Sequence, residues 1–291
     1  MILSEFDAWL LTPRRRRLVM GVLNVTPDSF SDGGHFTDIE SAVERGVAMA
    51  AAGADLIDIG GESTRPGSEP VGAGEQVARV VPIIRGLRNR TDAVISIDTG
   101  LAAVAEAAID SGANVINDIY GGTQDPGLLE VAARRGVPVI LMHMQGRPAS
   151  MQVNPQYGDV MQEVMAFLAE RTDAAVAAGV ARWRILVDPG IGFGKTLAHN
   201  LELLRRLGEM RSLGRPVVVG VSRKGFIGKV TGETVESGRP FGTAGAVAFA
   251  AANGADVLRV HDVAGMSQVV RMIEAIQNSG QAPPASGTKG T

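Results

Sequence analysis

The amino-acid sequence predicts an α/β fold, a single (β/α)8 TIM barrel with extended loops after the first and second strands. Eight apolar runs rich in Val and Ile recur along the chain, and Ala-rich segments with helical spacing lie between them. Several of these segments end in Gly just before the next run, as helices commonly do. Runs that are apolar throughout, rather than alternating, are typical of parallel strands buried on both faces. A doubly wound open sheet is the alternative.

The expected strands follow the eight runs in order along the chain. They lie within residues 17–25, 54–61, 93–99, 113–121, 137–144, 184–190, 215–222 and 255–261. We expect the longer outer helices near 158–179 and 198–213. The loops at 24–36 and 60–74 exceed the usual ~2–6 residues of a strand-to-helix connection, which is typical of lids and binding loops. Residues 1–280 are predicted to form one domain, with the first dozen residues as an addition and 281–291 as a disordered tail.

Composition and charge exclude several classes of protein. The 291 residues include no Cys, which excludes disulfides, Cys-ligated zinc, Fe–S clusters and thiol catalysis. A net charge of −3 provides no general attraction for nucleic acid or for an acidic membrane. The N-terminal residues do not match a signal peptide, and no apolar run approaches the ~20 residues of a membrane span. We therefore expect a cytoplasmic protein that binds neither nucleic acid nor membrane.

The stretch VDPGIGFGKT, residues 187–196, matches a phosphate-binding P-loop only in part. The GKT of that motif is present, but position 189 is Pro where the motif requires Gly, and Gly190 comes one residue too late. A shift of one residue reorients the backbone amides that would hold the phosphate. We therefore predict that this stretch is not a P-loop, and its notable feature becomes Asp188 at the end of a strand.

Polar residues stand at the end of nearly every predicted strand. They are Asn24, Glu62, Asp98, Asn117, His143, Asp188, Ser222 with Lys224, and Arg259 with His261. The carboxyl ends of barrel strands meet at one face, where the active sites of this fold lie. Helix capping could explain one or two of these residues, but Lys, Arg and His are poor N-caps. The pattern favours a shared site.

One side of this site carries two carboxylates and an amide. Asp98, Asn117 and Asp188 could clamp a flat heterocycle, because an ionised carboxylate accepts two parallel hydrogen bonds from an amino group and the ring N–H beside it. A general acid/base pair, as in a glycosidase, is the alternative. Asn117 and Asp118 are neighbours on a strand, so only one of them can face the barrel interior. We assign Asn117 to the site and Asp118 to a structural role.

The other side of the site is cationic. Arg259 and His261 are two residues apart and leave the same face of the last strand, while Arg65 and Lys224 lie in loops after other strands. The loops after strands seven and eight of a barrel often bind phosphate, so we expect an anion site here. Arg223 could equally be a surface charge. The His residues show no zinc-type spacing, and any metal should be a hard cation such as Mg²⁺, held mostly by phosphate oxygens.

Eight motifs, taken together and in order, resemble those of the dihydropteroate synthase family of pterin-binding barrels. They are MGVLNVTPDSFSDGG, DIGGESTRPGSEPV, SIDT, INDIYGG, LMHMQGRP, DPGIGFGKT, GVSRKGFIG and RVHD, and the match extends from about residue 18 to residue 278. The resemblance implies a transferase of folate synthesis. It would condense 6-hydroxymethyl-7,8-dihydropterin pyrophosphate with p-aminobenzoate and release pyrophosphate and 7,8-dihydropteroate.

The resemblance also implies roles for individual residues. The residues that would bind the pterin are Asp98, Asn117, Met142, Asp188, Phe193 and Lys224. Those that would bind pyrophosphate are Asn24, Thr64, Arg65, Arg259 and His261, with Asn24 also contacting Mg²⁺. Those that would border p-aminobenzoate are Phe30, Thr64, Pro66, Lys224 and Gly225. Catalysis would fall to Asp98, Lys224 and Arg65.

Further expectations follow from the same resemblance. We expect inhibition by sulfonamides and a homodimer formed through outer helices. Gly225 departs from the Ser that many family members have, so we expect weaker p-aminobenzoate binding at most. Two alternatives stay open: a methyltetrahydrofolate-dependent corrinoid methyltransferase, which needs no pyrophosphate site, and a non-catalytic pterin-binding paralogue.

Overall fold

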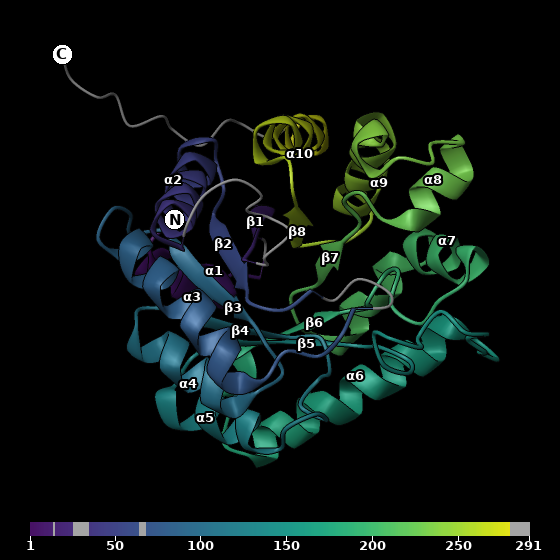
Figure 1. Ribbon diagram of the computed structural model, residues 1–291. Coiled ribbons are helices and arrows are strands. Elements are labelled where there is room, and N and C mark those ends of the chain that lie inside the picture. The colour runs from purple at the N-terminus through teal and green to yellow at the C-terminus, as the bar shows by residue number, and fades with distance from the viewer. Residues whose placement is uncertain (14, 26–34, 64–67, 280–291) are drawn as a thin grey trace.

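The computed structural model describes residues 1–13, 15–25, 35–63 and 68–279, and it places eight parallel strands in one sheet (Figure 1). The strands are β1 Leu18–Asn24, β2 Leu56–Gly60, β3 Val94–Asp98, β4 Val115–Asp118, β5 Val139–Met142, β6 Ile185–Asp188, β7 Val218–Gly220 and β8 Val257–Val260. Their order is β6-β5-β4-β3-β2-β1-β8-β7. Pairing of Val187 with Val217 joins the two ends of this order, which confirms the barrel and excludes an open sheet.

Helices surround the barrel and connect each strand to the next (Figure 1). They are α1 Leu3–Leu11, α2 His35–Ala51, α3 Ala73–Arg88, α4 Ala102–Asp110, α5 Gly127–Arg135, α6 Val160–Ala177, α7 Leu197–Arg205, α8 Gly225–Thr231, α9 Pro240–Ala252 and α10 Val263–Gln277. The helix expected over 198–213 is in fact α7 followed by a 3-10 helix at Leu207–Leu213. Gly208 lies at this change and weakens a continuous α-helix there.

The strands are buried along nearly their whole length, as their uninterrupted apolar runs predict. Side chains on their outer faces pack against the surrounding helices in two large apolar clusters. Side chains on their inner faces form a third cluster inside the barrel, to which every strand contributes: Leu18, Met20, Leu56, Val94, Val115, Ile140, Leu186, Val218 and Val257. The amino-terminal half of the barrel is therefore filled with packed apolar side chains.

Helix α1 closes this end of the barrel, so the prediction that the first dozen residues are merely an addition is wrong. Phe6, Trp9 and Leu10 of α1 are buried in the cluster inside the barrel. The Trp9 indole donates to the Arg16 carbonyl at 2.8 Å, and the Val94 amide donates to the Met1 carbonyl at 3.1 Å. The inward-facing apolar side chains of the strands need a cover at this end, which α1 provides. The carboxyl-terminal end is left as the face for a site.

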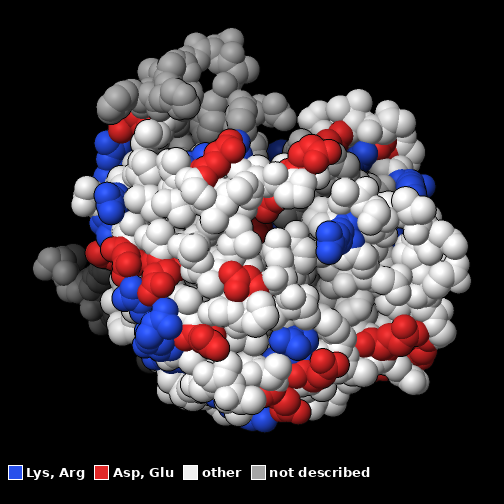
Figure 2. All heavy atoms as spheres, turned by 60° about the horizontal axis from the view of Figure 1, so that its bottom comes forward, with Lys and Arg blue, Asp and Glu red and all other residues white. Residues whose placement is uncertain are grey.

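Charged side chains of both signs are interspersed on the surface seen in Figure 2. Many belong to local ion pairs, such as Arg206 with Asp159 at 3.0 Å and Arg135 with Asp110 at 2.6 Å. Over the described ranges, no helix has both the length and the apolar character needed to cross a membrane.

Candidate active site

The strand register brings polar residues to one level at the carboxyl end of the barrel. Asn24 of β1 is paired with Gly60 of β2, Gly60 with Asp98 of β3, and Asp98 with Asn117 of β4. A Cβ atom at Gly60 would lie 3.7 Å from Asn24 Oδ1 and 3.8 Å from Asp98 Oδ2. The side chains of Asn24 and Asp98 therefore approach each other across the small Gly60, at the mouth of the barrel.

Arg259 of β8 reaches across the barrel to two carboxylates. Its Nε donates to Asp58 Oδ2 at 2.6 Å, and its Nη2 donates to Asp98 Oδ2 at 2.7 Å. Asn117 Nδ2 donates to the same oxygen of Asp58 at 3.1 Å. These four residues come from four strands and form one buried polar network. Charge-assisted bonds of this kind fix the direction of the guanidinium plane.

Burial raises the pKa of Asp98, and the charge of Arg259 partly opposes this rise. Burial alone would lower the pKa of Arg259, but Asp58 and Asp98 outweigh it and keep the guanidinium charged. Burying the charge of Asp98 or of Arg259 without a partner would cost free energy. Each charge therefore stabilises the ionised form of the other. The network thus holds a positive and a negative group in contact at the mouth.

Asn117 and Asp118 point in opposite directions, as neighbours on a strand must. Asn117 joins the network inside the barrel. The carboxylate of Asp118 accepts hydrogen bonds from the amides of Tyr120, at 2.8 Å, and Gly122. Asp118 therefore stabilises the turn that follows β4.

Asp188 and Lys224 lie on the opposite wall of the mouth. Asp188 Oδ1 accepts a hydrogen bond from the Gly190 amide at 2.7 Å, which leaves Oδ2 for another donor. Lys224 Nζ donates to the Ile191 carbonyl and lies 4.2 Å from the centre of the Phe193 ring. Burial lowers the pKa of Lys224 to about 7, although the charge of Asp188 opposes this. Burial raises the pKa of Asp188, and the charge of Lys224 opposes that in turn.

An apolar wall lines the space beside these charged groups. Met142 of β5 and Phe193 of the loop after β6 pack together with Ile119 and Met151 in a small separate cluster. Both Met142 and Phe193 are buried. A flat aromatic ligand could lie against this wall while its edge faces carboxylates and an amide, which is the usual composition of a small-molecule site.

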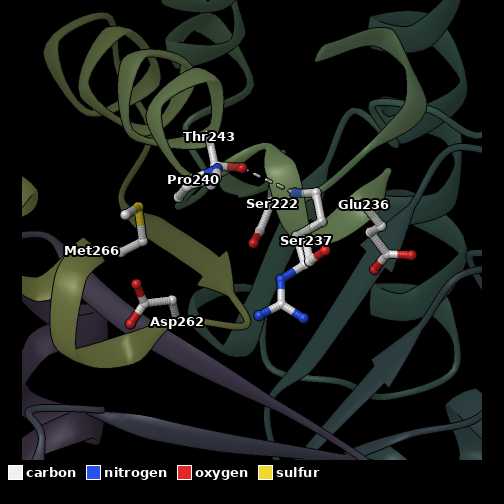
Figure 3. A pocket seen from close by; sticks show the side chains of 8 residues that line it. Ser222, Glu236, Ser237, Pro240, Thr243, Asp262 and Met266 are labelled. Carbon is white, nitrogen blue, oxygen red and sulfur yellow. Dashed lines mark hydrogen bonds between the residues drawn. The ribbon is translucent and has the colours of Figure 1, made fainter. Parts of the chain in front are cut away.

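His261 and Ser222 occupy the ends of β8 and β7. His261 Nδ1 lies 3.1 Å from Ser222 Oγ, and the His261 amide donates to the same oxygen at 3.2 Å. A cavity of about 130 Å³ opens beside them, lined by Ser222, Arg223, Glu236, Ser237, Pro240, Thr243, Asp262 and Met266 (Figure 3). It is smaller than the ~300–1,000 Å³ of typical ligand pockets. Gly225 starts α8, and a Cβ atom there would meet nothing within 4 Å, so a Ser would fit without rearrangement.

Seven of the predicted polar residues lie at the carboxyl end of the barrel strands: Asn24, Asp98, Asn117, Asp188, Lys224, Arg259 and His261. Phe30, Thr64, Arg65 and Pro66 lie outside the described residues.

The donor set fits a hard cation that is completed by a ligand. Asn24 supplies an amide oxygen, and Asp98 beside it supplies a carboxylate. In the described part of the chain, no three His, Asp or Glu residues form a metal cluster. Oxygen donors of this kind suit Mg²⁺, which commonly binds through one or two protein oxygens together with phosphate oxygens and water.

Asp58 is the functional residue that sequence reasoning missed. It is fully buried, and it is the one residue that contacts both Arg259 and Asn117 within the described network. It lies two residues before Gly60 and so shares the inward face of β2. The available signal was an Asp inside an apolar strand, because a buried carboxylate requires a charged or hydrogen-bonding partner.

Comparison with known proteins agrees with this geometry. The family model described as "Pterin binding enzyme" matches residues 20–261. Dihydropteroate synthase from Synechocystis sp. is 47% identical over 262 residues, which cover 90% of this chain and 91% of that protein.

Two solved structures show the same fold at similar identity. Xanthomonas albilineans dihydropteroate synthase with 4-aminobenzoic acid has a TM-score of 0.85 and 46% identity, covering 90% of this chain and 93% of that one. The Yersinia pestis dihydropteroate synthase with a sulfonamide drug complex has a TM-score of 0.85 and 45% identity, covering 90% and 95%. On the strength of the family match and of this identity over nearly the whole chain, the protein belongs to the dihydropteroate synthase family of pterin-binding enzymes.

Proposed function

We propose that this chain condenses 6-hydroxymethyl-7,8-dihydropterin pyrophosphate with p-aminobenzoate to give 7,8-dihydropteroate and pyrophosphate. One observation carries the proposal at the level of the site: Arg259 Nη2 lies 2.7 Å from Asp98 Oδ2. A cation suited to the leaving pyrophosphate is thereby held against a carboxylate suited to the pterin. A corrinoid methyltransferase has no leaving group that requires this cation.

In this proposal the pterin lies against Met142 and Phe193, with its polar edge toward Asp188 and Asn117. The free Oδ2 of Asp188 accepts from the amino group, while Asp188 Oδ1 is held by the Gly190 amide. Lys224 donates to an acceptor atom of the ring. Each of these groups is buried or half-buried, so their hydrogen bonds form in surroundings of low polarity and select strongly for a matching ligand.

The reaction breaks the bond between the exocyclic methylene carbon and the bridging pyrophosphate oxygen, and the electron pair leaves with pyrophosphate. Arg259 and His261, together with Arg65, neutralise the charge that develops on the leaving group. Asn24 would hold Mg²⁺, which when bound would supply further neutralisation of the phosphate oxygens.

The dihydropterin ring donates electron density to the methylene carbon as the leaving group departs. Ionised Asp98 stabilises the positive charge that this creates, and Arg259 keeps Asp98 oriented toward the site. The aniline nitrogen of p-aminobenzoate then forms the new carbon–nitrogen bond and loses one proton. The proposal requires no covalent enzyme intermediate.

The p-aminobenzoate site is assigned to Phe30, Thr64, Pro66, Lys224 and Gly225. Because sulfonamides imitate p-aminobenzoate and carry an additional substituent, we propose that they inhibit this chain. The cytoplasmic location expected from the sequence stays a prediction.

A homodimer through outer helices is also part of the proposal. The helices α8 and α9 and the segment between them expose Val230, Val235 and Phe241, of which Phe241 is 91% exposed. Exposed apolar side chains gathered on neighbouring elements are typical of contact surfaces between proteins. Replacing Phe241 with Asp should shift the sedimentation coefficient from that of a dimer to that of a monomer, whereas an unchanged dimer would place the contact elsewhere.

Release of pyrophosphate, measured with and without p-aminobenzoate, tests the reaction. Release that depends on p-aminobenzoate, together with formation of dihydropteroate, is the expected result. Pterin binding without turnover would indicate a non-catalytic paralogue. Methyl transfer from methyltetrahydrofolate to a corrinoid, without pyrophosphate release, would indicate the methyltransferase.

A further inference from the structure

Lys195 is a buried side chain that the proposed reaction does not use, and burial lowers its pKa to about 7. Its side chain is only 2% exposed, and its amine is bonded to acceptors of the protein itself. Its Nζ donates to the Phe193 carbonyl at 3.0 Å and lies 3.0 Å from His143 Nδ1. A longer contact of 3.4 Å joins it to the His143 carbonyl. Three donors of one ammonium group therefore face three acceptors.

The His143 ring is suited to accept this hydrogen bond. Burial lowers the pKa of His143 to about 3, and the charge of Lys195 contributes to this lowering, so the ring is neutral. Its edge packs against the Phe167 ring at a centroid distance of 5.0 Å, and its other ring neighbour is Tyr157 at 6.0 Å. The neutral ring is thus held in place with Nδ1 toward Lys195.

These contacts join two loops that approach each other closely. His143 follows β5, whereas Phe193 and Lys195 belong to the loop between β6 and α7. A Cβ atom at Gly190 would collide with the His143 carbonyl, and one at Gly194 would collide with the Gln145 carbonyl. The two backbones therefore lie in direct contact. Lys195 bonds them together from one side, and Gln152 and Tyr157 donate from the other to the carbonyls of Gly192, at 2.7 Å, and Gly194, at 2.8 Å.

The loop held in this way carries groups assigned to the pterin. The Phe193 ring is one wall of the site, and the Ile191 carbonyl accepts a hydrogen bond from Lys224. Lys224 in turn lies over the Phe193 ring. A shift of this loop would therefore move both the wall and the cation that face the pterin.

We propose that Lys195 is a positioning residue of the pterin site, which fixes residues 190–194 against the end of β5 so that Phe193 and Lys224 are held in their binding positions. This inference rests on the function proposed above. It assigns Lys195 no contact with substrate. It also accounts for the GKT sequence without a P-loop, because the Lys195 amine is bonded to acceptors of the protein itself.

Loss of Lys195 should affect the pterin part of the site and not the pyrophosphate part. Among the described residues, the hydrogen-bond partners of Arg259 and His261, which are assigned to pyrophosphate, are Asp58, Asp98 and Ser222, and none of these belongs to the loop. Loss of the Lys195 contacts should therefore weaken pterin binding and leave pyrophosphate binding intact. Loss of a side chain that only supports overall folding would weaken the binding of both ligands.

The test compares Lys195→Met with the wild type in two calorimetric titrations, one with 6-hydroxymethylpterin and one with pyrophosphate and Mg²⁺. Met has a similar length but no donors. We expect the dissociation constant for the pterin to rise about tenfold or more, the size of effect seen when an outer partner of a binding residue is lost. The dissociation constant for pyrophosphate should be unchanged, and the Michaelis constant for the pterin substrate should rise.

Arg88→Met is the matched control. Arg88 is a half-buried side chain that likewise bonds backbone carbonyls, those of Gly112, Thr91 and Ala93, but it lies at the amino-terminal end of the strands. It should lower the melting temperature without changing either dissociation constant. If Lys195→Met does not fold, His143→Leu removes one of the three acceptors and should cause a smaller rise for the pterin alone.

The outcomes separate the two proposals. A wild type that does not bind the pterin would overturn the proposed function. A wild type that binds and turns over, with Lys195→Met or His143→Leu binding the pterin equally well, would overturn this inference alone. Parallel weakening of pterin and pyrophosphate binding would also overturn it, because it would mean that Lys195 acts on the whole structure.

Discussion

Asp188→Asn should weaken pterin binding without lowering the stability of the free protein. The carboxylate is buried, and its Oδ1 already accepts the Gly190 amide at 2.7 Å. An asparagine at this position would keep that bond by placing its carbonyl oxygen there, which turns its amino group toward the mouth and against the donors of the pterin. Hydrogen bonds to charged groups contribute about 1.5–3 kcal/mol each, so loss of a two-bond contact costs about 3 kcal/mol or more. This corresponds to about 100-fold weaker pterin binding.

The same substitution should not destabilise the free protein at neutral pH. Burial raises the pKa of Asp188 above its value in the unfolded chain. The buried carboxylate therefore lowers the free energy of unfolding as the pH rises above the unfolded pKa of about 3.9. Below that pH the carboxyl is protonated in both states and has no such effect. Asn carries no charge, so we expect a melting temperature equal to or above that of the wild type at about pH 8, with the difference vanishing below about pH 4.

Calorimetry with 6-hydroxymethylpterin and thermal unfolding across this pH range give the test. Asp256→Asn is the control, because Asp256 also has a pKa raised by burial and accepts one amide, that of Val217 at 2.8 Å, but it lies at the opposite end of the strands. The control should leave pterin affinity unchanged. Unchanged pterin affinity in Asp188→Asn would refute the assignment, and a large loss of stability at about pH 8 would refute the argument from burial.

Four further predictions concern other parts of the molecule. Asp58→Asn removes the charge that pairs with Arg259 at 2.6 Å, and it should lower kcat/KM for the pterin substrate while circular dichroism shows an intact fold. Phe6→Ala should lower the free energy of unfolding by about 3–5 kcal/mol in denaturant titrations, without changing pterin affinity, because Phe6 is fully buried far from the mouth. p-Aminobenzoate should bind poorly to the free protein and well with pyrophosphate and Mg²⁺, and the coupling must be reciprocal in titrations run in either order. Phe30→Leu, or one residue inserted after Pro66, should raise the sulfonamide inhibition constant more than the Michaelis constant for p-aminobenzoate, and equal increases would contradict the assigned pocket.

The arrangement of strands and helices could be predicted from the sequence because its causes are local. Uninterrupted apolar runs required strands buried on both faces, and the eight runs became β1 to β8 with ends that moved by one to three residues. Asp98 and Asp188 could be placed at the mouth because each lies at the end of its strand, and Asn117 because it lies one residue before the end of its strand. The separation of Asn117 from Asp118 followed from the alternation of side chains along a strand.

Contacts between distant segments could not be predicted in this way, since they depend on closure of the barrel. Arg259 meets Asp58 and Asp98 across 201 and 161 residues of sequence, and only the strand order and register bring them together. Helix α1 looked like an addition because nothing in its own sequence shows that the amino-terminal end of the barrel needs a cover. The spacing of GKT argued against a P-loop but gave no partner for Lys195, because its acceptors on His143 and Phe193 lie where two loops touch. Local periodicity determines which face a side chain occupies, whereas the partner of a buried charge is determined by whatever the closed barrel places within hydrogen-bonding distance.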